Sequence, residues 1–248
     1  MLKAIPIISF TCLCIACIGH TQTASTVQFQ YHSISSTIQA DSVTQQWLKP
    51  YNDSIEKYLN TTIGFSLENV YKNKGGGALG NLVTQAMLQQ AQTKAGTALH
   101  AAILHPSAIK GYLAQGNITI GSLIQLLPYN NQLVIVPISG LHLTQLIQQM
   151  AADGGWPISG IKYSITPQGN AKNIYINNEP IIPGNTYHIV VTDYMKNGNY
   201  KCEILKLLPQ VSLNTNLRES CKLYIESFTN KHEPLAINKV SPINYVYE

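Results

Sequence analysis

The spacing of apolar residues predicts several amphipathic helices. In segment 79–90 apolar residues recur at intervals of three and four, which places them on one face of a helix. The same spacing predicts helices over 123–127, 141–150 and 216–228. These segments supply the helical half of the expected fold.

Other segments alternate between apolar and polar residues or are continuously apolar, which predicts strands. They are residues 25–36, 98–104, 133–138, 161–166, 173–177 and 187–192. The tail from Lys231 shows little pattern. Because no repeat or linker interrupts this mixture of helices and hairpin-like strands, we predict a single α+β domain in which helices pack on mixed sheets.

The first predicted helix precedes this series. Asp41 has the side chain of a good N-cap, so a helix is expected to run from there through Trp47. Pro50 is expected to break the helix or to restart it before Leu59, because proline lacks the backbone N–H of a helix interior.

The N-terminus has the pattern of an export signal. Lys3 precedes an apolar run over 4–18, which is short for a membrane span. Ala16 before Cys17 resembles a bacterial lipobox, although Cys14 stands where the lipobox has Leu. We therefore expect Cys17 to be lipidated.

These features predict the organisation of the chain. Residues 1–17 are a signal peptide, 18–40 an N-terminal segment and 41–248 the domain. The protein is then a periplasmic or outer-membrane-anchored lipoprotein of a Gram-negative bacterium, held to the membrane by its lipid only. The alternative is simple secretion with cleavage near Ala24.

Export changes the interpretation of the remaining cysteines, Cys202 and Cys221. Two cysteines in an oxidising compartment make a disulfide plausible, and two buried free thiols are the alternative. Neither belongs to a CxxC pair, so a redox motif and a thiolate metal site have no support.

The charge pattern limits the function classes. The formal net charge of +4 is too small and too dispersed for a nucleic-acid binder. Arg218 is the only arginine, and every other basic residue apart from histidine is lysine. Since planar bidentate recognition of phosphate is arginine chemistry, this chain can perform it at one position at most.

A search for catalytic motifs gives little. The seven histidines are isolated and form no HExxH or similar metal-ligand spacing. The glycine run 75–77 beside Lys72 and Lys74 could cradle a phosphate, or it is a flexible connector. Asp193 follows a strong strand and could hold a ligand hydroxyl or cap the next turn. No self-contained catalytic centre emerges, and no metal ligands are assigned.

An ordered series of short motifs nevertheless resembles the C-terminal, substrate-recognition domain of the 5′-nucleotidase/UDP-sugar hydrolase family. The series is LGNLVTQAM at 79–87, GNIT at 116–119, PYNN at 128–131, SGIKY at 159–163 and TDYM at 192–195. The resemblance covers roughly residues 41–228. It implies a mixed, multilayered α+β fold.

The resemblance also implies a division of labour. In the family a separate metallophosphoesterase domain binds two metal ions and hydrolyses the phosphate ester, whereas the C-terminal domain binds the nucleoside. The expected partners of this chain are therefore a nucleotide and a separate metallophosphoesterase protein, which would supply the divalent metal cofactor. Hydrolysis by this chain alone is not expected.

Site residues follow from the resemblance position by position. Tyr129 and Asn131 stand where the family has the aromatic residue and the Asn of P-F-x-N, and Tyr200 matches the second base-stacking aromatic. His105 and Lys110 stand where the family has the Asn and the phosphate-side Arg of N-G-G-G-I-R. The alternative for both tyrosines is simple packing against the core.

The departures from the family all weaken one function. The three glycines of that turn are replaced by Pro-Ser-Ala, and a lysine point charge replaces a guanidinium. Gln85 stands where the family has an Asp. We therefore expect a partly degenerate nucleotide pocket, and the alternative function is a non-catalytic scaffold lipoprotein that keeps the fold without nucleotide binding.

Overall fold

The computed structural model describes residues 29–33, 35 and 38–247. The predicted signal peptide and Cys17 lie outside these residues and stay predictions. The predicted strand 25–36 lies partly outside them, and it is wrong for residues 29–33, which form no strand. The chain divides after Trp47 into two units, and the larger unit, residues 48–248, holds every strand that the structure describes.

The first described helix, α2 (Ser42–Leu59), confirms the predicted cap. The Asp41 Oδ1 atom accepts a hydrogen bond of 2.7 Å from the Thr44 N–H. The predicted break at Pro50 is wrong, because the helix continues through it. Position 50 is exposed, so the carbonyl of Gln46 that loses its helical donor can be hydrated instead.

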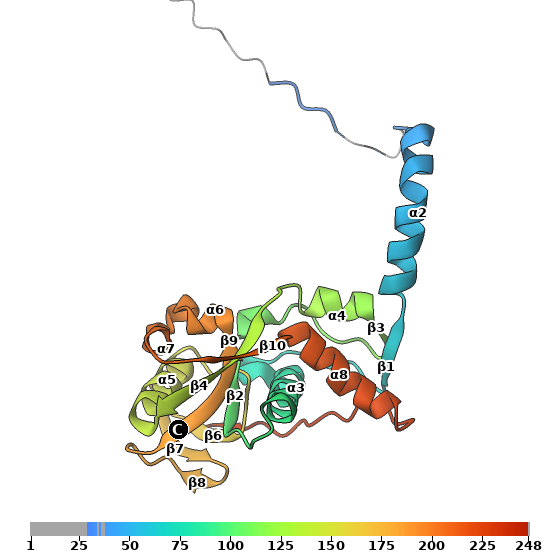
Figure 1. Ribbon diagram of the computed structural model, residues 1–248. Coiled ribbons are helices and arrows are strands. Elements are labelled where there is room, and N and C mark those ends of the chain that lie inside the picture. The colour runs from blue at the N-terminus through green and yellow to red at the C-terminus, as the bar shows by residue number, and fades with distance from the viewer. Residues whose placement is uncertain (1–28, 34, 36–37, 248) are drawn as a thin grey trace, which may run out of the picture. The chain divides into compact units, whose positions relative to one another are not determined.

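A five-stranded sheet forms the centre of the larger unit (Figure 1). Its strands, in spatial order, are β10 (Val211–Asn216), β4 (Gln132–Ser139), β9 (Thr186–Thr192), β2 (Ala101–Ile103) and β5 (Ile158–Ser159). Strand β4 runs antiparallel to β9, and β2 runs parallel to β9. The ends of β2 and β9 and the start of β4 therefore meet at one edge of the sheet.

Two smaller sheets complete the β structure. The four-stranded sheet has the order β11 (Ile243–Tyr245), β6 (Ile161–Ile165), β7 (Ala171–Ile176) and β8 (Glu179–Pro180), and the two-stranded sheet pairs β1 (Thr62–Ser66) with β3 (Gly116–Thr119). The tail, for which the sequence predicts little pattern, thus supplies β11, which pairs in parallel with β6.

Helices cover both faces of the central sheet. Helices α3 (Gly77–Ala95), α4 (Ile120–Leu126) and α8 (Leu217–Thr229) lie on one side and α5 (Gly140–Ala152) on the other (Figure 1). The remaining helical turns are α6 (Asp193–Lys196), α7 (Glu203–Lys206) and the short 3₁₀ turns Lys74–Gly76, Pro106–Ala108 and Asn199–Lys201. The predicted α+β fold with helices on mixed sheets is confirmed.

The central sheet separates two apolar cores. Along β4, Leu133 and Ile135 face the core under α3 and α8, whereas Val134 and Val136 face the core under α5. This alternation follows from the two-residue period of a strand. Both faces of the sheet are buried, which makes it the rigid frame of the unit.

The two cores explain why, of the two alternatives for the cysteines, the disulfide is wrong and the buried free thiols are confirmed. Cys221 belongs to the core under α8 and Cys202 to the core under α5, so the sheet lies between them. Both cysteines are buried free thiols, and burial raises the pKa of each to about 12. Their thiols are therefore protonated and unreactive in the folded protein.

None of the helices within residues 38–247 is both long enough and apolar enough to cross a membrane.

Candidate functional site

The edge of the central sheet at the ends of β2 and β9 carries a group of aromatic and lysine side chains. We call it the aromatic–lysine cluster, and its members are His105, Lys110, Tyr129, Tyr194 and Tyr200. His105 follows β2, Tyr194 follows β9, and Tyr129 precedes β4. The sheet topology therefore gathers residues that lie far apart in the sequence.

Two of the predicted site residues are in direct contact. The rings of His105 and Tyr200 stack with centroids 3.7 Å apart and an interplanar angle of 6°. Trp156 packs edge-on against His105 at 4.8 Å, and Tyr194 packs edge-on against Tyr200 at 5.1 Å. One face of the Tyr200 ring is thus covered by the His105 imidazole.

The backbone of Tyr200 is held in an unusual conformation. Its φ of 58° is in the left-handed region, which costs a residue with a Cβ atom about 1–3 kcal/mol. Its carbonyl accepts a hydrogen bond of 3.0 Å from the Gln149 side chain of α5. Lys201 also has a positive φ, of 61°. The surrounding structure therefore holds this turn in a strained backbone conformation, and such conformations are common at functional sites.

His105 is neutral at physiological pH. Its Nδ1 atom accepts from the Ser107 N–H at 3.2 Å, so the ring proton is on Nε2. Burial lowers the pKa of His105, the nearby Asp153 carboxylate opposes this shift, and Lys72 adds to it. The imidazole in the cluster therefore acts as a flat stacking group and contributes no charge.

Lys110 and Tyr129 form the exposed half of the cluster. The Lys110 ammonium lies 5.4 Å from the centroid of the Tyr129 ring, within the range of a cation–π contact. Tyr129 is 46% exposed, so its interpretation as a core-packing residue is wrong. The exposed ring of Tyr129 therefore lies beside a positive charge.

Arg218, the only arginine, holds the loop that carries Tyr129. The Arg218 guanidinium donates to the carbonyls of Leu127 and Pro128 at 2.9 Å each. These carbonyls immediately precede Tyr129, so α8 fixes the loop that presents the ring. Arg218 is a positioning residue.

Asn131 and Asp193 anchor the base of the site. The Asn131 carbonyl accepts from the Leu217 N–H at 2.8 Å, and Asn131 is half-buried. Asp193 Oδ1 accepts from the N–H groups of Gln132 and Tyr194. The interpretation of Asp193 as the cap of the following turn is wrong, because Thr192 is the N-cap of α6 and its hydroxyl accepts from the Met195 N–H at 3.3 Å. The Asp193 carboxylate instead ties the start of β4 to the first turn of α6.

The glycine run is neither a phosphate cradle nor a flexible connector. Gly75 and Gly76 are buried, and a Cβ atom on Gly76 would lie 2.9 Å from the Cα atom of Pro157. Lys72 donates to the carbonyls of Pro106 and Ile109 and so holds the loop that carries His105. The run is a site of close packing.

Sequence reasoning missed two contacts of the site. Trp156 and Tyr194 were not assigned to it, yet they flank the stacked pair of His105 and Tyr200. The signal available for Tyr194 was its place directly after a strand end, next to Asp193. Nothing in the sequence indicates the position of Trp156.

Within the described part of the chain, no three His, Cys, Asp or Glu residues gather closely enough to hold a metal ion.

The fold and the site thus define an α+β domain that gathers aromatic and lysine side chains at the edge of its central sheet. The chain belongs to the 5′-nucleotidase C-terminal domain family, whose profile matches residues 56–207.

Two curated relatives from Bacillus subtilis share part of this sequence. The trifunctional nucleotide phosphoesterase protein YfkN is 24% identical over 135 residues, which is 49% of this chain and 9% of that protein. The endonuclease YhcR is 27% identical over 168 residues, 64% of this chain and 13% of that protein. The chain therefore matches only about a tenth of the length of either relative.

Among solved structures, a 5′-nucleotidase precursor from Thermus thermophilus superimposes with a TM-score of 0.69 at 21% identity. The match covers 83% of this chain and 43% of that one. At this identity the likeness establishes the shared fold.

Proposed function

We propose that this chain recognises a nucleotide at the aromatic–lysine cluster and presents its phosphate to a metallophosphoesterase carried by a separate protein. The observation that carries the proposal is the meeting of Lys110, Tyr129 and Tyr200 at one sheet edge, in a domain of the 5′-nucleotidase family. These residues combine a flat stacking surface with a cation.

Each residue has a distinct part in the proposed binding. A base stacks on the exposed ring of Tyr129, and such stacking contributes about 1–3 kcal/mol per base. The Lys110 ammonium attracts the phosphate as a point charge, without the bidentate geometry of arginine. Because His105 covers one face of Tyr200, the ligand contacts at most the other face, and the affinity is correspondingly modest.

The experiment is a phosphatase assay with AMP and UMP on the purified chain, alone and with a candidate metallophosphoesterase plus Mn²⁺. We expect no hydrolysis by the chain alone and a fall in the KM of the partner when the chain is added. The Tyr129→Ala variant should lose this effect, whereas Tyr175→Ala, which removes an exposed tyrosine of β7 outside the cluster, should keep it. A KM that the chain does not change would contradict the proposal for that partner.

One observation favours a second candidate, a scaffold protein that keeps the fold without nucleotide binding. The stacking of His105 on Tyr200 occupies a ring face that a base could otherwise use. This candidate predicts that nucleotides leave the melting temperature of the protein unchanged. A rise in melting temperature with AMP or UMP, absent in Tyr129→Ala, would exclude it.

A further inference from the structure

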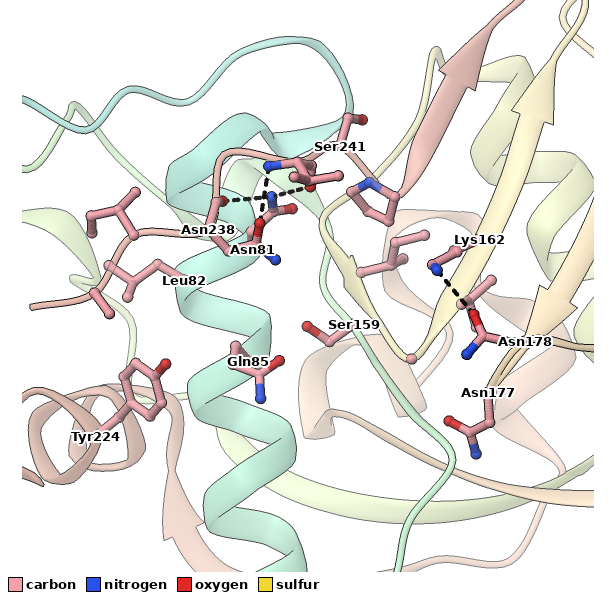
Figure 2. Close-up of a pocket in the computed structure, with 17 residues that line it drawn as sticks. Asn81, Leu82, Gln85, Ser159, Lys162, Asn177, Asn178, Tyr224, Asn238 and Ser241 are labelled. Carbon is pink, nitrogen blue, oxygen red and sulfur yellow. Dashed lines mark hydrogen bonds between the residues drawn. The ribbon is translucent and has the colours of Figure 1, made fainter.

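A cavity lies away from the aromatic–lysine cluster, between α3, the β7–β8 hairpin and the C-terminal tail (Figure 2). We call it the amide groove. Its volume of about 700 Å³ is within the range of small-ligand sites. Nothing in the proposed nucleotide function uses it.

Uncharged amide side chains dominate the polar lining of this groove. Gln85 projects from α3 on one wall, Asn177 and Asn178 come from the hairpin on the opposite wall, and Asn238 comes from the tail (Figure 2). No carboxylate stands among the described residues that line it. Lys162 is the one charged side chain among them, and its ammonium donates to Asn178 Oδ1 at 2.9 Å.

These amides keep hydrogen-bonding capacity for a ligand. Within the described residues, the side chains of Gln85 and Asn177 have no hydrogen bond, and Asn178 uses only its oxygen. Asn238 likewise uses only its Oδ1 atom, which accepts from the Val240 N–H. Since an amide both donates and accepts, such a set suits a neutral ligand whose groups do the same.

The hairpin turn keeps its amides at a conformational cost. Asn177 and Asn178 form the two-residue turn between β7 and β8, and their φ values are 51° and 66°. Glycine is the usual residue at the second position of such a turn because it takes positive φ without strain. A side chain at position 178 is therefore not required by the turn, and it faces the groove.

The remaining wall is apolar. Its accessible apolar surface comes from Ala236, Ile237 and Val240 of the tail, whereas the lining residues Leu82, Ile158 and Ile161 are buried. Ser159 adds a hydroxyl that is shared with Thr84. Apolar patches alternating with amides match the C–H faces and hydroxyl rims of a sugar ring. They match an acetamido group equally well.

We propose that the amide groove binds an uncharged saccharide that carries acetamido groups. The chemistry does not suit a cation, for lack of carboxylates, and offers an anion only one lysine that already has a partner. The proposal is independent of nucleotide binding, because the two sites share no residue.

The test is ligand-observed NMR titration of the full chain with the β-1,4-linked trisaccharide of N-acetylglucosamine, using maltotriose, triglycine and uridine as comparison ligands. We expect millimolar or tighter binding of the acetylated saccharide and weaker binding of the others. Gln85→Ala and Asn178→Gly should each raise its Kd about threefold to tenfold, as the loss of one or two hydrogen bonds implies.

Both variants have matched controls. Gln89→Ala lies one turn further along α3, and Asn173→Gly removes another exposed Asn with positive φ, at 52°; neither residue lines the groove. Both controls should bind as the wild type does. No binding of the acetylated saccharide, equal binding by all variants, or preferential binding of triglycine or uridine would overturn the proposal.

Discussion

Lys110 and Tyr129 keep the positions that the family resemblance gives to ligand-binding residues, although the side chains at this site differ from those of the family. Lys110 still contacts the ring of Tyr129, but it stands where the family resemblance places a guanidinium. His105 stands where the resemblance places Asn, and it now stacks on Tyr200. These substitutions therefore lead us to expect that the proposed nucleotide site binds with modest affinity.

The lowered pKa of His105 gives a test at this scale. Its ordinary pKa is 6.5, and burial lowers it in the folded state. The unfolded state then binds more protons, so the stability from neutral His105 is complete above that pH and is lost as the pH falls through the folded-state pKa. Between about pH 7.5 and about pH 5.5 the wild type should lose more stability than His105→Gln, measured by urea denaturation. Parallel pH profiles would contradict this prediction.

Arg218 gives a second test. Arg218→Ala removes the donors to the Leu127 and Pro128 carbonyls, and we expect the free energy of unfolding to fall by about 1–3 kcal/mol. Lys222→Ala is the matched control, because it removes partly exposed ion pairs with Glu219 and Glu226 on the same helix and should cost about 0–1 kcal/mol. Equal denaturation midpoints for the two variants would refute the positioning role.

At the scale of elements, the helices and strands with a clear apolar pattern were the ones that the sequence predicted. The apolar spacing over 79–90 predicted α3, and the long apolar run over 133–138 predicted β4, because their patterns are local. Strands β1, β3 and β11 were missed because each is short and forms only by pairing with a distant segment. The same limit applies to the disulfide, since only the fold places a sheet between Cys202 and Cys221.

In the candidate site, too, some residues could be predicted from the sequence but their contacts could not. Its tyrosines at 129 and 200 came from the motif series, whereas the stacking of Tyr200 on His105 depends on the left-handed turn at 200–201, which no local pattern indicates. A long, periodic element is encoded locally, but a side-chain contact between loops depends on tertiary packing.

The junction before α3 gives a test at this scale. Gly76 has a φ of 97° and lies against Pro157, so Gly76→Ala adds both backbone strain and overpacking, about 2–6 kcal/mol together. Gly96→Ala is the matched control at the other end of α3: its φ is 64° and its Cβ would meet open space. The control should cost about 1–2 kcal/mol. A Gly76→Ala variant as stable as Gly96→Ala would show that the run is not tightly packed.

For the whole molecule, the buried central sheet provides two sites of different chemistry. The aromatic–lysine cluster at the sheet edge carries positive charge and exposed rings, whereas the amide groove beside α3 is nearly neutral. The fold thus separates the proposed nucleotide site from the proposed site for an uncharged ligand. A change in one should leave the other intact, because no residue belongs to both.

Isothermal titration of AMP into the purified chain tests nucleotide recognition at the aromatic–lysine cluster most directly. We predict a saturable heat at millimolar AMP that weakens by about 1–3 kcal/mol of binding free energy in Tyr129→Ala and is unchanged in Tyr175→Ala. The absence of heat with the wild type, with and without Mg²⁺, or an equal heat with Tyr129→Ala, would contradict the account.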